Sequence, residues 1–398
     1  MSIDWEARFS PYGRLATASE IRELLKVLDR PGIISFAGGI PDPAFFPTAL
    51  IAEAHRHVLE DPARGGASLQ YSISEGYPPL REWLVGHMRA KNVECGINNI
   101  LITTGSQQGI YLVGRLLLSP GDGVLTARPT YLGVLQAFAG SEPRYGTLGA
   151  LTGGQPFPAK LGYAMPDFAN PTGESITLPG RMALVAGAYL KDVVLLEDAA
   201  YTDLRYSGVP RPSLLALDLE RCGNIEESRV IYTGTFSKTI IPGLRVGWVV
   251  APKAVIQKLV LLKQASDLHT STLTQIVLNE VASRLPQSHM AMLCENYGAR
   301  CAAMLKALTQ HMPPGVTWTK PEGGMFVWVT LPEGIDGAQL LAQAIEIGVA
   351  FVPGAAFFPQ DRQRNTLRLN FSLCDPATIG EGIARLGKLI ATRAKDYA

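Results

Sequence analysis

Short apolar runs alternate with amphipathic segments through the middle of the chain. Runs typical of strands lie at 100–105, 123–129, 193–201, 229–237 and 245–252. Two of them are followed by segments with helical apolar spacing, at 106–118 and 130–140, and we expect Ser106 to be the N-cap of the first helix. Strands this apolar, separated by helices, indicate an α/β fold with a sheet covered on both faces.

The pattern changes after residue 285. A long helical stretch at about 288–311 precedes short apolar runs and another helical segment, which favours a smaller α+β domain. The segment SEIRELLKVL near the N-terminus is amphipathic but too short to fold alone. We therefore predict an N-terminal segment at 1–45 that packs with the small domain, a large domain at 46–285 and a small C-terminal domain at 286–398.

Composition removes several classes of function. The 398 residues are 47% hydrophobic and 18% charged, as in an ordinary folded protein, and the net charge of +1 gives no reason to expect a nucleic-acid or membrane partner. The five cysteines are scattered without a CxxC pair, and no histidine cluster accompanies them. We therefore predict reduced thiols, no metal site and a cytoplasmic location.

Polar residues gather at the carboxyl ends of the predicted strands. These ends read TTGSQQG, RPTYLG, DFANPTG, LLEDAAY and TGTFSK. Because open α/β sheets bind ligands at this edge, we expect the polar side chains to converge there. A glycine turn that opens a helix, as at 105–107, suits a phosphate, although an ordinary helix cap also explains it.

Three charged residues are ambiguous one by one. Asp198 could be a salt-bridge partner, Lys238 a solvated surface charge and Arg245 half of a surface ion pair. Together they have one chemical explanation. The carboxylate can hold a pyridine nitrogen protonated, a partly desolvated lysine can form a Schiff base, and the arginine with the glycine turn can hold a phosphate. These groups describe a site for pyridoxal 5'-phosphate (PLP).

Longer motifs extend this interpretation. SFAGGIPDPAFFP, LQYSISEGYPPLREWL, ITTGSQQG, NPTG, TFSKTIIPGLRVG, GGMFVWV, VAFVPG and NTLRLNFS follow in order. With them the chain resembles, over nearly its whole length, the fold-type I PLP-dependent aminotransferases of class I/II, and among these the 2-aminoadipate/kynurenine/aromatic aminotransferase branch. The resemblance implies an aspartate aminotransferase-like fold, with a mostly parallel seven-stranded sheet covered by helices in the large domain and a smaller α+β domain.

The resemblance also implies roles at the cofactor. Lys238 would bond PLP and move a proton, Asp198 would pair with the pyridinium nitrogen, and Asn170 and Tyr201 would hydrogen-bond the phenolic oxygen. Tyr131 would stack on the ring, although it could instead be a core aromatic residue. The phosphate ligands implied are Ser106, Gln107, Thr235, Ser237 and Arg245, joined by Tyr71 from the partner subunit of a homodimer with shared active sites.

Three further residues are expected at the substrate. Arg368 would bind the α-carboxylate in a bidentate fork, and the backbone N–H of Gly39 would assist it. In aminoadipate-type relatives an arginine at the position of Arg22 meets a distal carboxylate, but a helix-face salt bridge with Glu20 or Asp29 explains this residue equally well. The segment 146–165 is shorter and richer in glycine than in relatives, so we expect a helix to be missing or reduced there.

The predicted activity is transfer of an amino group from an L-amino acid to a 2-oxo acid, 2-oxoglutarate first among them, by a ping-pong mechanism. The amino donors implied are 2-aminoadipate and amino acids with aromatic or large apolar side chains. A different PLP reaction on the same scaffold, such as that of a β-lyase, decarboxylase or racemase, stays open because fold does not fix function. A transcription regulator built on this scaffold is disfavoured, because only about thirty-five residues precede SFAGG.

Overall fold

Seven strands form the main sheet, in the order β2-β8-β7-β6-β5-β3-β4. The computed structural model describes residues 3–15 and 32–394, and within them β8 runs antiparallel to both neighbours while the other pairs are parallel. The strands are β2 (Ile100–Thr103), β3 (Gly123–Thr126), β4 (Arg144–Thr147), β5 (Leu161–Ala164), β6 (Val194–Asp198), β7 (Val230–Thr235) and β8 (Gly247–Val250).

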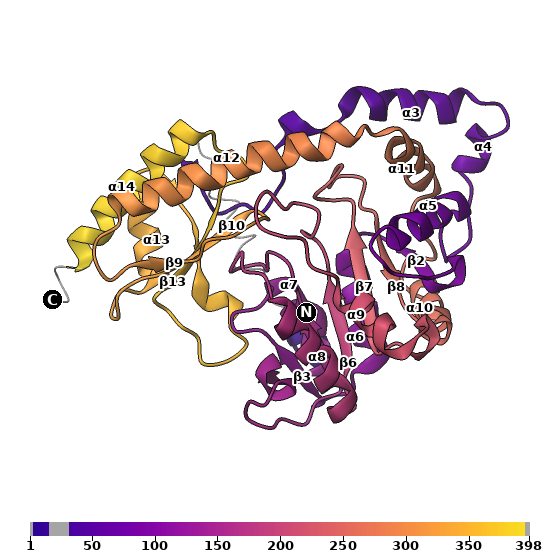
Figure 1. Cartoon of the computed structure of the whole chain (residues 1–398), viewed down its shortest axis with the longest axis horizontal. Helices are drawn as coiled ribbons and strands as arrows, with labels where there is room; N and C mark the ends of the chain where they lie inside the picture. Colours follow the sequence, from indigo (N-terminus) through magenta and orange to yellow (C-terminus); the bar gives the residue numbers. More distant parts are fainter. Residues whose placement is uncertain (1–2, 16–31, 395–398) are drawn as a thin grey trace.

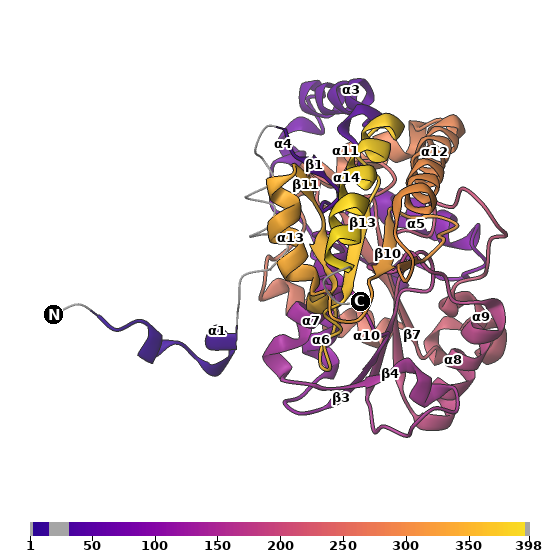
Figure 2. The same ribbon diagram turned by 90° about the vertical axis from the view of Figure 1, so that its left-hand side faces the viewer.

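Both faces of this sheet are covered by helices, because successive apolar residues of each strand point to opposite sides. Leu195 belongs to a core with α5, α8, α9 and α11, and its neighbour Leu196 to a core with α6, α7 and α10. Figure 2 shows α8 and α9 on one side of the strands and α6 and α7 on the other. The predicted α/β architecture is thereby confirmed. The covering helices are α5 (Pro78–Arg89), α6 (Ser106–Leu117), α7 (Leu132–Phe138), α8 (Leu178–Lys191), α9 (Leu214–Cys222), α10 (Lys253–Gln264) and α11 (Thr272–Arg284).

A second sheet forms a smaller body beside the first. It is antiparallel, in the order β12-β13-β10-β9, and packs against α12 and α14 through a separate apolar core. In Figure 1 the long helix α12 runs from α11 beside the large sheet to α14 beside the small one. The elements are β9 (Thr317–Trp318), β10 (Phe326–Thr330), β12 (Val352–Pro353), β13 (Thr366–Asn370), α12 (Gln287–His311), α13 (Gly337–Glu346) and α14 (Pro376–Ala394).

The N-terminal residues reach this smaller body through a short strand pair. β1 (Ile34–Ser35) pairs in parallel with β11 (Val349–Ala350). The helices α1 (Pro11–Leu15), α3 (Thr48–Glu60) and α4 (Gly65–Ser68) precede α5 along the chain. The boundaries that we predict at residues 45 and 285 stay predictions. No helix within the described ranges is long and apolar enough to cross a membrane.

Two local predictions can be compared with the observed chain. Ser106 is not the N-cap of α6: Gly105 takes that position with a φ of 77°, and the helix begins at Ser106. Glycine has no Cβ and adopts this backbone conformation without steric cost, whereas a serine at this position would be strained. The residues between β4 and β5, all described, contain only the 3₁₀ turn η5 (Leu148–Leu151), in agreement with the expected loss of a helix.

Candidate active site

Lys238 lies in the turn that follows β7. Its Nζ donates a hydrogen bond of 2.8 Å to the carbonyl of Gly39 and lies 5.6 Å from the centre of the Tyr201 ring. Burial, together with the positive charges of Arg368 and Arg245, lowers the pKa of the Lys238 amine to about 8. The amine is therefore much closer to its neutral, nucleophilic form at physiological pH than an ordinary lysine.

Asp198 ends β6 on the face that α6 and α7 cover. Its Oδ2 accepts a 2.7 Å hydrogen bond from the hydroxyl of Tyr163, whereas Oδ1 has no hydrogen-bond partner among the described residues. The side chain is 1% exposed, and this burial raises the pKa of the carboxyl to about 6. A buried carboxylate oxygen without a partner is costly, so the site is built for a further donor, and a pyridinium N–H fits that requirement.

The preceding carboxylate has a different task. Glu197 points to the opposite face of the sheet, since side chains alternate along a strand. It accepts hydrogen bonds of 2.9 Å from the backbone N–H groups of Leu214 and Leu215. These groups open α9, where unpaired N–H donors need acceptors, so Glu197 caps a helix while Asp198 faces the site.

An anion site lies at the start of α6. No side chain in the described part of the protein caps this helix, so its first N–H groups point outward. A Cβ at Gly105 would lie 2.5 Å from Nη2 of Arg245, which places the guanidinium directly against the turn. Arg245 also donates to Ser237 Oγ at 3.4 Å, and Ser237 accepts from Thr235 at 2.9 Å. Helix N–H groups, two hydroxyls and a guanidinium together suit a phosphate monoester.

Gln107 and Tyr131 form the side of the site next to this turn. The Tyr131 hydroxyl donates to Oε1 of Gln107 at 3.2 Å, and the Gln107 amide donates to the carbonyl of Gly133 at 2.7 Å. Burial and the nearby charge of Asp198 raise the pKa of Tyr131 to about 12. Tyr131 packs against the apolar core and its pKa responds to the charge of Asp198. The structure is therefore compatible with a core aromatic residue and with a residue that stacks on the cofactor ring.

Arg368 is buried in β13 of the small sheet. Nη1 donates to Asn170 Oδ1 and Nη2 donates to the carbonyl of Ala37, each at 2.9 Å, while Nε has no partner in the described part of the chain. The guanidinium lies 4.4 Å from the centre of the Phe326 ring and 5.2 Å from that of Phe357. Burial lowers its pKa to about 10, so the guanidinium stays charged at physiological pH, with its Nε–H lacking an acceptor.

Tyr201 and Gly39 complete the group around Lys238. Tyr201 is buried, its ring meets Phe326 edge-on at 5.6 Å, and burial raises the pKa of its hydroxyl. A Cβ at Gly39 would approach the Phe326 ring to 3.2 Å. The missing side chain therefore keeps the backbone close to Arg368 and Lys238.

Two predicted residues are not part of this group. Tyr71 is 80% exposed and meets only the edge of His269, at 6.0 Å, among the aromatic contacts of the described residues. Arg22 lies outside the described residues. Two residues of the site were not predicted. The signal for Tyr163 is its place in β5, the strand beside Asp198 of β6, and the signal for Phe326 is its place at the start of the apolar, buried strand FVWVT.

Comparison with known proteins agrees with this site. Residues 167–386 match the family described as Aminotransferase class I and II. The aromatic-amino-acid aminotransferase 1 of Thermococcus litoralis is 41% identical over 99% of this chain and 96% of its own, and the 2-aminoadipate transaminase of Thermus thermophilus is 39% identical over 98% of both chains.

Solved structures give the same result. The kynurenine aminotransferase of Pyrococcus horikoshii, in complex with PMP, superimposes with a TM-score of 0.90 at 40% identity and 98% coverage of both chains. The aspartate aminotransferase of Thermus thermophilus, at a TM-score of 0.82 and 21% identity over 96% of this chain and 99% of its own, shares the fold. This chain therefore belongs to the class I and II aminotransferases and is a PLP-dependent transaminase.

Proposed function

We propose that the protein transfers the amino group of an L-amino acid, 2-aminoadipate or one with an aromatic or large apolar side chain, to a 2-oxo acid, with 2-oxoglutarate as the first candidate. One observation carries the proposal. Lys238 Nζ and Arg368 Nη2 bind the carbonyls of Gly39 and Ala37, two residues apart on one backbone segment. An α-amino acid carries its amine and its carboxylate on the same carbon, so groups that bind the two must lie close together, as Lys238 and Arg368 do on this segment.

PLP, when bound, supplies an electron sink for the pair of electrons left when a proton leaves the substrate carbon. Lys238, with a pKa of about 8, gives and takes that proton at Nζ. Asp198 would hold the ring nitrogen of bound PLP protonated through its unpaired Oδ1, while Tyr163 keeps Oδ2 hydrogen-bonded. The free Nε of Arg368 binds and orients the substrate carboxylate, between aromatic rings that exclude water from it.

The donor class rests on two kinds of support. The relatives near 40% identity are named for aromatic amino acids and for 2-aminoadipate, whose side chains share no polar group. A site that accepts both needs an apolar pocket and a separate contact for the distal carboxylate. We assign that contact to Arg22.

The test mixes the PLP-loaded protein with one amino acid at a time, without an oxo acid, and follows the visible absorbance. L-2-aminoadipate, L-phenylalanine, L-leucine and L-glutamate form the panel. Bleaching by the first three supports the assignment, whereas a product formed from a single substrate without bleaching would favour another PLP reaction. In Arg22→Ala the rate with 2-aminoadipate should fall while that with leucine is unchanged. A rate with 2-aminoadipate equal to that of the wild type would remove Arg22 from the substrate site.

A homodimer with shared sites is the second part of the proposal. Tyr71 belongs to an exposed apolar group and lies near the turn that opens α6. Its ring contacts His269, and the hydroxyl of the next residue, Thr270, lies 3.1 Å from that of Thr104 beside this turn. The group comprises Leu69, Tyr71, Ile73 and Leu268, which are 69, 80, 47 and 42% exposed. A second copy of the chain would cover it and receive Tyr71 at its own phosphate site.

Subunit mixing tests this arrangement. Lys238→Ala and Tyr71→Ala variants, each impaired alone, are unfolded, mixed and refolded together. Shared sites predict that activity returns in the mixture, because one site of each hybrid dimer is then intact. Activity no higher than that of the separate variants, or a monomer in solution, would contradict the proposal.

A further inference from the structure

Three segments that carry site residues meet at the side chain of Arg205. Its Nη2 donates to Asp167 at 3.0 Å and its Nη1 donates to Glu322 at 3.0 Å. Asp167 lies three residues before Asn170, Arg205 four residues after Tyr201, and Glu322 four residues before Phe326. One guanidinium therefore ties together the backbones that bring these three side chains to Arg368 and Lys238.

Backbone contacts strengthen the connection between the second and third segments. Residue 205 forms an isolated antiparallel bridge with Gly323, the Gly324 N–H donates to the carbonyl of Leu204 at 2.9 Å, and the Tyr206 N–H donates to that of Glu322 at 3.1 Å. A Cβ at Gly323 would lie 2.3 Å from the ring of Phe168, over which the Arg205 guanidinium stacks at 4.6 Å. The segment of Gly323 and the segment of Phe168 therefore pack in close contact at Arg205.

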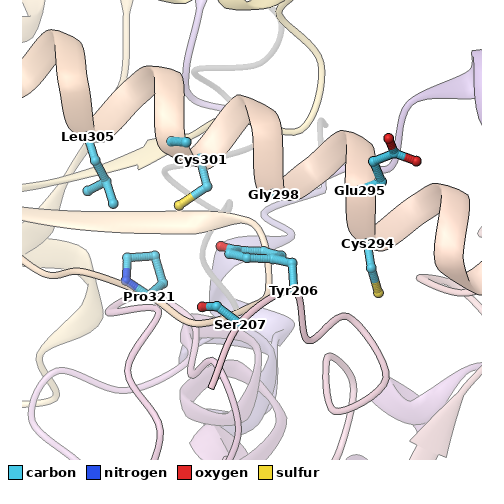
Figure 3. Close-up of a pocket in the computed structure, with 9 residues that line it drawn as sticks. Tyr206, Ser207, Cys294, Glu295, Gly298, Cys301, Leu305 and Pro321 are labelled. Carbon is cyan, nitrogen blue, oxygen red and sulfur yellow. The ribbon is translucent and has the colours of Figure 1, made fainter. Parts of the chain in front are cut away.

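The outer side of this junction is open. Figure 3 shows Tyr206, Ser207 and Pro321 facing helix α12 across a pocket of about 390 Å³, which Cys294 and Cys301 also line. Tyr206 is nevertheless held in place, because its hydroxyl donates to the carbonyl of Gly323 at 3.1 Å and a Cβ at Gly298 of α12 would lie 3.0 Å from its Cβ. The ion pairs of Arg205 therefore add to contacts that already fix the junction from this side.

We propose that Arg205 is a positioning residue for the substrate-carboxylate site, holding Asn170 and Phe326 in register with Arg368. The proposal rests on the function proposed above, in which Arg368 binds the substrate carboxylate. Asn170 accepts from Arg368 and Phe326 lies under it, so a shift of either segment changes the direction of the free Nε. Small misplacements of a binding group cost much of its effect.

The network allows Arg205 to be changed without leaving a buried charge alone. Asp167 keeps Arg181, whose Nη2 lies 2.6 Å away, and Glu322 keeps Arg211 at 3.0 Å. Arg205→Met also retains an unbranched side chain over Phe168. Breaking a buried pair is severe when one partner is orphaned, which does not happen here. Arg211→Met is the matched control, because it removes the other cation at Glu322 and touches neither Asp167 nor its segment.

The experiment measures the binding of 3-phenylpropionate, an aromatic carboxylate without an amino group, to the PLP-loaded protein by calorimetry. We expect Kd to rise about tenfold in Arg205→Met, to recover in part in Arg205→Lys and to stay within about twofold in Arg211→Met. The midpoint of the pH titration of the visible absorbance should also move in Arg205→Met alone, because Tyr201 and Asn170 move with the network.

Wild-type binding by Arg205→Met, or equal weakening in Arg211→Met, would overturn the proposal. If Arg205→Met does not fold, Glu322→Ala takes its place, since it removes the acceptor of one arm of the bridge and leaves the other. An unchanged Kd in that variant is equally decisive against the proposal. Arg368→Met separates the two levels of inference. If it binds the probe as the wild type does, the carboxylate site itself is wrong, whereas weak binding in Arg368→Met with normal binding in Arg205→Met rejects only the role of Arg205.

Discussion

The hydrogen bond from Tyr163 to Asp198 gives the sharpest prediction. Tyr163→Phe removes only the hydroxyl that donates to Oδ2 at 2.7 Å and keeps the ring in its buried place. The donor stabilises the ionised carboxylate, so its loss raises the pKa of Asp198. Because only the ionised form holds a pyridinium nitrogen, the variant should need a higher pH to bind PLP tightly.

The magnitude follows from the burial of the pair. A hydrogen bond to a charged group contributes about 1.5–3 kcal/mol, which corresponds to about 1–2 pH units. The pKa of Asp198 in the cofactor-free protein is about 6. It should therefore rise to about 7–8 in the variant, so that at pH 6.5 the ionised fraction falls by about 3-fold to about 25-fold and at pH 8.5 it falls less than about twofold.

The raised pKa of Asp198 also makes the stability of the cofactor-free protein depend on pH. The folded pKa of Asp198, about 6, lies above its ordinary value of 3.8, so the folded state binds the proton more tightly than the unfolded state. The resulting contribution of Asp198 to the free energy of unfolding is fully present below pH 3.8 and is lost as the pH rises through 6. In Tyr163→Phe the loss should continue to about pH 7–8.

The assay is a PLP titration at a series of pH values, followed by visible absorbance, for the wild type and Tyr163→Phe. Tyr145→Phe is the control, because the buried hydroxyl of Tyr145 in β4 has no hydrogen-bond partner within the described ranges. The reasoning is refuted if the affinity midpoint of Tyr163→Phe coincides with that of the wild type, or if Tyr145→Phe moves it by the same amount.

Two other changes test the remaining parts of the site. Lys238→Ala should abolish the visible band of the lysine-bound cofactor and amino transfer, with an unchanged far-UV circular dichroism spectrum, and full turnover would reject the assignment of this lysine. Gly105→Ala should destabilise the protein by about 1–3 kcal/mol through its positive φ and weaken PLP binding by displacing Arg245, measured by urea unfolding and PLP titration. Gly121→Ala, also at positive φ but with open space at its Cβ, should lower stability alone; equal PLP affinities in the two glycine variants would contradict the proposed phosphate site.

The sequence was most informative where chemistry follows a strand directly. Asp198 and Lys238 come after apolar runs, and parallel strands bring such ends to one edge, so their convergence could be predicted from the sequence alone. Tyr163 could not be predicted in this way. Its role depends on the register of β5 with β6, in which Tyr163 pairs with Leu196 and so reaches Asp198 diagonally on the same face.

The long-range contacts between charged residues could not be predicted from the sequence either. Asp167 and Arg205 are 38 residues apart, and Arg205 and Glu322 are 117 apart, so each reads in the sequence as an ordinary surface charge. The neighbouring positions of β5 and β6 bring Asp167 to Arg205, and Glu322, which lies between β9 and β10 of the small sheet, joins them. The role that we propose for Tyr71 requires a second chain, and no pattern within one sequence fixes the geometry of such a contact.

The opposite orientations of Glu197 and Asp198 link the chemistry to the length of β6. A one-residue insertion or deletion before Glu197 would exchange the faces of these two side chains. Glu197 would then face the cofactor edge and Asp198 would face α9, each with the wrong side-chain length and position for the contacts that the other makes. Unlike a point substitution, such a change cannot be compensated at one site, so β6 should tolerate many apolar replacements and no change of length.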